Sequence, residues 1–229
     1  MEDNFDFELI ESDQVSPVQP EPIPEPQPEP QAEVKPAKKK LTKSQQLFKD
    51  VKDVLVIVTV FMVAYVLFFR AVVVVGDSMY DTLVSGDYLL VLNNLVYQNP
   101  KSGDIVVASK DSFRNGECII KRVIATEGQE VDIDFATGKV YVDGELLDEP
   151  YLYTPTKTPE GMKFPLIVEE GCLFVMGDNR MESMDSRNPT IGMIDKREVL
   201  GKAIFLLMPG RGTDQHPSEF DLSRIGVVN

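Results

Sequence analysis

An uncharged apolar run from Val54 to Phe69 constrains this chain more than any other feature. The run is slightly shorter than the roughly 20 residues that cross a bilayer as a helix. Lysine side chains before the run and Arg70 after it can reach toward water on either side and make up the length. A cleaved signal peptide also places a basic region before an apolar one, but this run begins far from Met1 and no small-residue cleavage site follows it. The sequence therefore predicts one membrane-spanning helix over residues 54–70.

The residues before this run form two segments of opposite charge. Residues 1–36 are acidic and rich in proline, cannot bury a core, and are expected to be disordered, as a spacer, a tether or a partner-docking tail. Residues 37–53 form a basic segment beside the membrane, within which Leu41 to Asp53 can form a short amphipathic helix. Because the lysines precede the apolar run, we expect a cytoplasmic N-terminus, a lipid bilayer as partner, and a C-terminal domain outside the cell membrane.

The net charge of -14 belongs largely to the tail, because ten of the 37 acidic residues lie between Glu2 and Glu33. This balance argues against nucleic-acid binding, which needs a basic face. Cys118 and Cys172 are too few for a disulfide framework or a structural zinc site, and the sequence leaves open whether they pair or stay free. Neither a dinucleotide-binding nor a P-loop glycine pattern occurs, so no cofactor is expected.

After residue 70 the pattern is one of many short strands separated by turn residues, which predicts a mainly β fold, a coiled sheet or barrel-like body over residues 71–210. A final segment covers residues 211–229. Hydrophobic and β-branched runs favour the strands 88–92, 105–109, 117–126, 131–135, 139–142, 172–176 and 203–208. The valines of residues 71–75 read as a buried strand that Gly76 and Asp77 interrupt, so that Ser78 is presented on the bend.

A serine hydroxyl such as that of Ser78 becomes a nucleophile only when a base removes its proton. His216 is the single histidine, and its polar, proline-containing surroundings argue against a Ser-His-Asp site. A desolvated lysine is the other option, because burial disfavours the ammonium form. Strand alternation places Lys121 on one face with Ile119 and Val123, although an edge-strand lysine would give the same pattern. The neighbouring arginine stays protonated and cannot act as a base.

Four sequence boxes behind the apolar run resemble the type I signal peptidases, membrane-bound Ser-Lys proteases of bacteria. Gly76-Asp-Ser-Met79 with Thr82-Leu83 is similar to the nucleophile box, and Lys101-Ser-Gly-Asp-Ile-Val-Val107 to the strand box that follows it. Lys121-Arg-Val-Ile124 is similar to the box that supplies the base. The last box, G-D-N-R-x-x-S-x-D-S-R, is matched from Gly177 to Arg187. The resemblance covers residues 43–209 in order.

The resemblance implies roles for individual residues. Ser78 would be the nucleophile, Lys121 the general base, and the Ser78 backbone N–H the oxyanion donor. Some family members add a hydroxyl two residues before the nucleophile; that oxyanion position is Gly76 here, so a second donor would have to come from elsewhere. Three further residues would support the site, Ser183 by bonding the lysine amine and Asp185 with Arg187 as an ion pair. Candidate walls of the substrate pockets are Met79, Tyr80 and Leu83.

The resemblance also implies substrates, namely secreted preproteins with small residues, typically Ala-x-Ala, before the cut. An extended segment can add to an exposed strand edge and direct alternate side chains into two shallow pockets. The family usually has proline where Asp81 stands, and a Gly-x-Pro-Gly-Asp continuation where residues 125–129 stand, so local geometry is expected to differ there. An inserted β region of about residues 134–171 is short, as in the compact Gram-positive type.

Two other functions fit the same residues. The first is a specialised Ser-Lys protease that processes only a few substrates. The second is a catalytically silent, anchored β-rich module that binds partners through its acidic tail. Cleavage of a generic preprotein distinguishes the signal peptidase from both.

Overall fold

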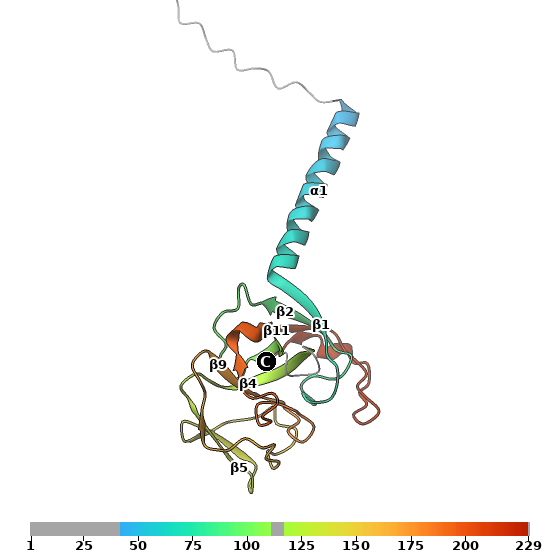
Figure 1. Cartoon of the computed structure of the whole chain (residues 1–229). Helices are drawn as coiled ribbons and strands as arrows, with labels where there is room; N and C mark the ends of the chain where they lie inside the picture. The colour runs from blue at the N-terminus through green and yellow to red at the C-terminus, as the bar shows by residue number, and fades with distance from the viewer. Residues whose placement is uncertain (1–41, 111–116, 229) are drawn as a thin grey trace, which may run out of the picture. The chain divides into compact units, whose positions relative to one another are not determined.

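The computed structural model describes residues 42–110 and 117–228. Its only long helix in these ranges, α1, runs without a break over Lys43–Phe68 (Figure 1). By length and composition α1 is able to cross a membrane. The expected short helix before Asp53 is therefore the first part of α1, and the helix ends before Phe69 and Arg70, which belong to the first strand. The disordered tail and the start of the basic segment lie outside the described residues.

The main sheet is antiparallel and confirms the mainly β fold. Its strand order is β1-β2-β11-β3-β4-β9-β10, and β12 pairs with β11. The bounds are β1 (Phe69–Val73), β2 (Tyr88–Asn93), β3 (Ile105–Ser109), β4 (Cys118–Thr126), β9 (Cys172–Met176), β10 (Ile194–Asp195), β11 (Val199–Met208) and β12 (Gly226–Val227). Because β12 pairs with β11, the C-terminal segment predicted for residues 211–229 is joined to the body by its last strand.

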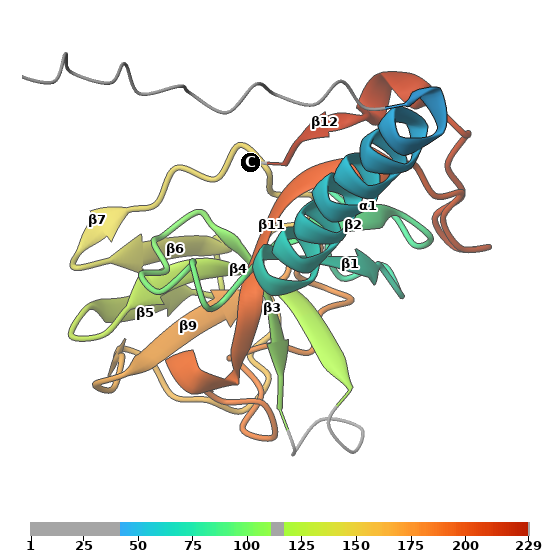
Figure 2. The ribbon, with the colours of Figure 1, turned by 90° about the horizontal axis from the view of Figure 1, so that it is seen from above.

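A second, smaller sheet has the order β7-β6-β5-β8. Its strands are β5 (Glu130–Asp134), β6 (Lys139–Val142), β7 (Glu145–Leu146) and β8 (Leu166–Ile167), and two short 3₁₀ helices, Lys196–Glu198 and Leu222–Arg224, lie elsewhere. The pairing of β5 with β6 is the hairpin that the turn at residues 136–138 predicts. Figures 1 and 2 both place this sheet on the side of the body away from β1 and β2.

Buried side chains join these elements into a packed body. One cluster packs Met79 and Leu83, from the turn after β1, against Leu89 of β2 and Ala203 of β11. Another packs Ile124 of β4 against apolar residues of β9 and of the small sheet. Ile120 of β4 packs against the first cluster, so the turn that carries Ser78 and the strand that carries Lys121 share one part of the core.

The valine run does not form the buried strand that its composition predicts. β1 is the first strand in the sheet order and pairs only with β2, so its other edge has no strand partner within the described residues. Val73 is 42% exposed and Val75 is 84% exposed, whereas Val74 is buried. The prediction of a buried strand was wrong because a run of β-branched residues fits an edge strand as well as a central one.

Candidate active site

Ser78 lies on the turn that follows β1. Gly76 adopts a positive φ of 88°, a conformation that residues with a side chain rarely take, and redirects the chain there. Asn179, from the loop after β9, donates its backbone N–H to the Ser78 carbonyl (3.1 Å) and its side-chain amide to the Asp77 carbonyl (3.2 Å). A distant loop therefore holds the backbone on both sides of the Ser78 hydroxyl.

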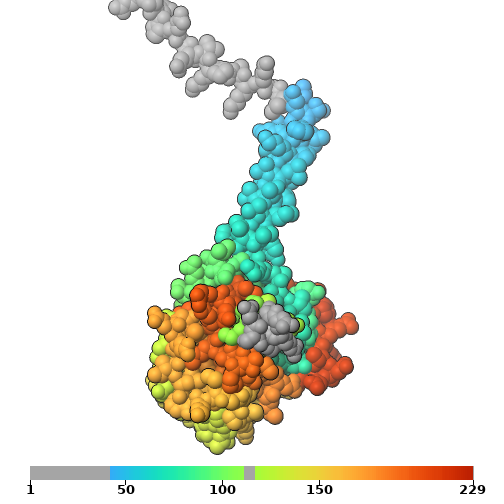
Figure 3. All heavy atoms as spheres, viewed as in Figure 1, coloured from blue at the N-terminus to red at the C-terminus, as the bar shows by residue number. Residues whose placement is uncertain are grey.

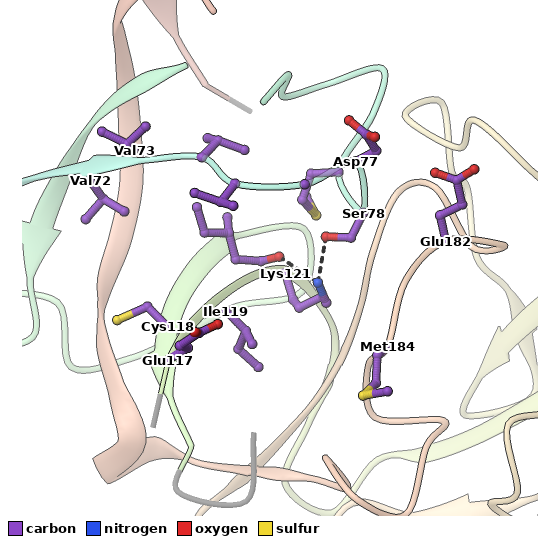
Figure 4. Close-up of a pocket in the computed structure, with 15 residues that line it drawn as sticks. Val72, Val73, Asp77, Ser78, Glu117, Cys118, Ile119, Lys121, Glu182 and Met184 are labelled. Atoms are coloured by element: carbon purple, nitrogen blue, oxygen red, sulfur yellow. Dashed lines mark hydrogen bonds between the residues drawn. The ribbon is translucent and has the colours of Figure 1, made fainter. Parts of the chain in front are cut away.

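Lys121 extends from β4 toward this turn. Its Nζ lies 2.7 Å from Ser78 Oγ and 3.1 Å from the Ile120 carbonyl oxygen (Figure 4). The Lys121 side chain is buried, as are Ile119 and Val123 two residues before and after it. Because β4 is also a central strand between β3 and β9, Lys121 is not the solvated edge lysine that the same pattern allowed. Burial lowers the pKa of Lys121 to about 8, although the charges of Asp185, Asp178 and Glu160 oppose the shift. A substantial fraction of the amine is therefore neutral slightly above neutral pH.

Behind the lysine lies a buried ion pair. The Arg187 guanidinium donates to both carboxylate oxygens of Asp185, each at 2.8 Å, and lies 3.1 Å from Glu160. Burial alone would raise the pKa of Asp185, but the hydrogen bonds and charge of Arg187 hold it below its ordinary value. Asp185 therefore stays ionised close to the lysine. The structure has the expected Asp185–Arg187 pair.

Ser183 occupies a different position from the one expected. Its hydroxyl donates to Asp185 Oδ2 (2.7 Å), and the two bonds of the Lys121 amine among the described residues go to Ser78 and Ile120. The expected direct bond from Ser183 to the amine is thus absent from this structure. The Ser183 hydroxyl donates to the Asp185 carboxylate instead of bonding to the Lys121 amine. This carboxylate is ionised and two residues away, and charged acceptors make stronger hydrogen bonds than neutral ones. Ser183 is therefore bonded to Asp185, whose charge acts on Lys121.

A second buried ion pair, which the sequence does not reveal, joins the elements of the site. Asp178 accepts two hydrogen bonds from Arg122 of β4, at 2.9 and 2.8 Å, and one from the Thr82 hydroxyl (2.6 Å). Arg122 also lies 3.9 Å from the centre of the Tyr151 ring. Asp178 therefore connects the strand of the base to the segment that follows the nucleophile. The only signal in the sequence was one residue of each charge, Arg122 and Asp178, in two of the boxes, and nothing in the sequence pairs them.

Gly177 shows how closely these segments approach. A Cβ at this position would lie 2.3 Å from Ser183 Oγ and 2.3 Å from the Ser78 carbonyl oxygen. Such contacts exclude any side chain. The glycine that opens the last sequence box is therefore needed so that the loop after β9 can pass directly beneath the nucleophile turn.

The candidate oxyanion donors differ in availability. No acceptor among the described residues is bonded to the Ser78 amide, which leaves it able to donate to a substrate. The Gly76 amide donates instead to Ser85 Oγ (3.3 Å). Gly76 therefore offers neither a side chain nor a free amide as a second donor.

A pocket of about 500 Å³ opens beside the Ser78 and Lys121 pair. It is lined by residues 72–79, residues 117–121, Glu182 and Met184. Of the three predicted wall residues, only Met79 lines it. Leu83 is 1% exposed and belongs to the core, while Tyr80 packs against Tyr153 and His216. The walls are chiefly the two chain segments that lead to the nucleophile and to the base. That these two segments form the walls could have been predicted from the order of the sequence boxes.

His216 has a more enclosed setting than the sequence indicates. Its side chain is only 15% exposed, its Nε2 lies 3.1 Å from Glu182 Oε2, and its ring packs on Tyr80. It has no hydrogen bond to Ser78 among the described residues, which agrees with the argument against a Ser-His-Asp site. Cys118 and Cys172 are both free, so the open question of their pairing is answered against a disulfide.

The chain is similar in sequence to proteins of a known family. Residues 47–208 match the model of the family "Signal peptidase, peptidase S26". The chain is 36% identical over 179 residues to a "Signal peptidase I" of Bacillus licheniformis, a match that covers 75% of this chain and 94% of that protein. It is 31% identical to "Signal peptidase I S" of Bacillus subtilis strain 168, a match that covers 74% of this chain and 93% of that protein. A solved structure of a signal peptidase I from Enterococcus faecalis is 30% identical in sequence. The match covers 45% of this chain and 96% of that chain, with a TM-score of 0.38. The chain belongs to the signal peptidase family, peptidase S26.

Proposed function

We propose that this protein is a membrane-anchored serine endopeptidase that removes signal peptides from secreted preproteins, with Ser78 as nucleophile and Lys121 as general base. The distance of 2.7 Å between Ser78 Oγ and a buried Lys121 Nζ carries the proposal. A hydroxyl and an amine at this separation can exchange a proton directly. The silent-module alternative provides no reason for a lysine to be buried against a serine.

The reaction then has two stages. The neutral Lys121 amine takes the Ser78 proton as Oγ attacks the scissile carbonyl, and the resulting oxyanion accepts a hydrogen bond from the free Ser78 amide. Lys121 returns the proton to the leaving amine, which leaves an acyl-enzyme. In the second stage Lys121 takes a proton from water, the hydroxide oxygen attacks the ester, and the proton passes to Ser78 as the signal peptide departs.

The pocket suits an extended substrate. The unpaired edge of β1 lies along one wall, and residues 117–121 lie along the other. A peptide strand can add to such an edge, with alternate side chains directed toward the valines and Met79. Small side chains can lie against this apolar wall of valines and Met79, which supports cleavage after an Ala-x-Ala pattern. Residues 1–42 would lie in the cytoplasm and the β body outside the membrane, with α1 as a single span.

Cleavage of an Ala-x-Ala preprotein by the purified full chain in detergent tests the proposal. We expect processing by the wild type and none by S78A or K121M, each with wild-type circular dichroism. Because a general base typically contributes about 10² to 10⁴ in rate, K121M should lose at least that much. Activity retained in K121M would refute the base assignment, and a folded wild type that cleaves only a few dedicated substrates would favour the specialised protease.

A further inference from the structure

Beside the nucleophile, on the side away from Lys121, lies a group of side chains that the proposed reaction does not use. Asp77, Glu182 and His216 each offer one potential ligand atom, and these three atoms lie within 4.8 Å of one another. The residues come from the turn after β1, the loop after β9 and the C-terminal segment. Figure 4 shows the carboxylates of Asp77 and Glu182 on facing loops next to Ser78.

One oxygen in this group lacks a partner that its burial requires. Asp77 Oδ1 is buried and has no hydrogen-bond donor among the described residues. It is the one such side-chain atom in that part of the chain. A buried carboxylate oxygen without a partner costs free energy, and a bound cation is one group that removes this cost. The observation points to a missing ligand with positive charge.

The surrounding residues already hold two of the three side chains, Asp77 and His216, in place. The Thr213 hydroxyl donates to Asp77 Oδ2 (2.5 Å) and accepts the backbone N–H of His216 (3.1 Å). The His216 ring packs against both Tyr80 and Tyr153, with ring centres 4.6 and 5.9 Å away. Outer contacts of this kind orient the ligands in known metal sites. Figure 3 shows the same neighbourhood at the surface, with the red C-terminal segment against the teal residues after β1.

We propose that Asp77, Glu182 and His216 bind a divalent transition-metal ion of the Zn²⁺ type. Zinc bonds of about 2.0 to 2.2 Å in a tetrahedron place neighbouring ligand atoms roughly 3.3 Å apart. The distance of 3.1 Å between His216 Nε2 and Glu182 Oε2 is close to that spacing. Glu182 is exposed and free to adjust. Three protein ligands leave the fourth position to water, and an imidazole ligand favours Zn²⁺ over Mg²⁺.

The position of the site gives it a consequence for catalysis that rests on the proposed function. Asp77 directly precedes Ser78, and both Asp77 and Glu182 line the substrate pocket. An ion between them would connect the two loops across the pocket and hinder entry of an extended peptide. Zinc is therefore expected to inhibit signal-peptide cleavage reversibly, with activity restored by a chelator.

Calorimetric titration of the full-length protein in detergent at neutral pH tests the site itself. ZnCl₂ is added to a C118S/C172S background, which removes the thiols as competing ligands. We expect one equivalent of Zn²⁺ to bind, and H216N and E182Q each to weaken this binding at least about tenfold. The control E169Q, an exposed acidic residue elsewhere, should bind like its parent, and excess Mg²⁺ should not compete. Absorption of bound Co²⁺ in the visible range should indicate four ligands in the parent and be lost in H216N.

Two results would overturn the site: equal binding by the parent, H216N and E182Q, or no binding by the folded parent. In that case the group is a hydrogen-bonded His-carboxylate network only. S78A separates this proposal from the proposed function, because it should bind Zn²⁺ like the wild type although it cleaves nothing. If zinc binds at this site but does not inhibit cleavage, only the inferred effect on the pocket is refuted.

Discussion

At the scale of single residues, the amine of Lys121 sets the pH dependence expected of the enzyme. Its pKa is lowered to about 8, chiefly by burial, and only the neutral form can accept the Ser78 proton. We therefore expect kcat/KM to fall as the pH drops below about 8, by roughly tenfold per unit, and to level off above it. Initial rates on a peptide substrate across the pH range give this profile. An acid limb near the value of a free lysine, about 10.4, would contradict it.

Glu160 offers a way to shift that profile without touching the reacting groups. Its negative charge stabilises the ammonium form of Lys121 and so opposes the lowering of the pKa. E160Q should therefore move the acid limb to lower pH, by less than about one unit, because a single partly screened charge contributes about 1 kcal/mol or less. The measurement is the same rate profile. E127Q is the matched control, an exposed carboxylate that is absent from the charges acting on Lys121.

Ser78 and Lys121 could be predicted from the sequence because the chemistry restricts the choice to few residues. A serine needs a base, one histidine in a polar segment is a poor candidate, and an arginine cannot deprotonate. The partner of Ser183 and the enclosure of His216 could not be predicted. The first depends on the local geometry of the loop after β9, because the partner, Asp185, is only two residues away. The second depends on which loops meet in space, because Glu182, His216 and Asp77 are far apart along the chain.

At the scale of elements, the strands were predictable and their places in the sheet were not. The turn chemistry and alternation of residues 131–142 give the hairpin and its partner strands. The valine run gives a strand but not its position, and β1 is an edge while β4 is central. This difference matters for function, because an edge strand can pair with a peptide, whereas a central strand can shield a lysine side chain from water.

The Arg122–Asp178 ion pair should be the main stabilising connection between β4 and the loop after β9. Arg122 and Asp178 have side chains 2% and 0% exposed. D178A leaves the guanidinium buried without its carboxylate, which we expect to cost about 3 to 5 kcal/mol of unfolding free energy. Chemical unfolding followed by near-ultraviolet circular dichroism measures it.

Two further variants test whether burial is the reason. R197A removes an ion pair whose arginine is 90% exposed, and its unfolding midpoint should stay within error of the wild type. The double variant R122M/D178A should recover part of the loss, because neither charge of this pair is then left buried without its partner. A D178A protein as stable as R197A would show that the pair does not join the elements as described.

At the scale of the whole molecule, the charges that flank the apolar helix favour one orientation of the chain in a membrane. The hydrophobic residues of α1 follow a lysine-rich segment, and Arg70 is the only basic residue close to its other end. Positively charged flanks are retained on the cytoplasmic side, so the body would be delivered to the outer side, where preproteins emerge. A catalytic pocket on the same side as the basic flank would have no access to them.

Cysteine labelling in intact cells tests this topology. C172S leaves the exposed Cys118 on the body as one reporter, and S44C in a C118S/C172S background places a reporter at the start of α1. A membrane-impermeant maleimide should label Cys118 in intact cells, and should label S44C only after permeabilisation. The reverse pattern would place the body in the cytoplasm, and labelling of both reporters in intact cells would mean that α1 does not separate them across the membrane. Because the predicted arrangement follows from the flanking charges, replacing the lysines of residues 35–43 with glutamine should weaken it, which mixed labelling of the S44C reporter in intact cells would reveal.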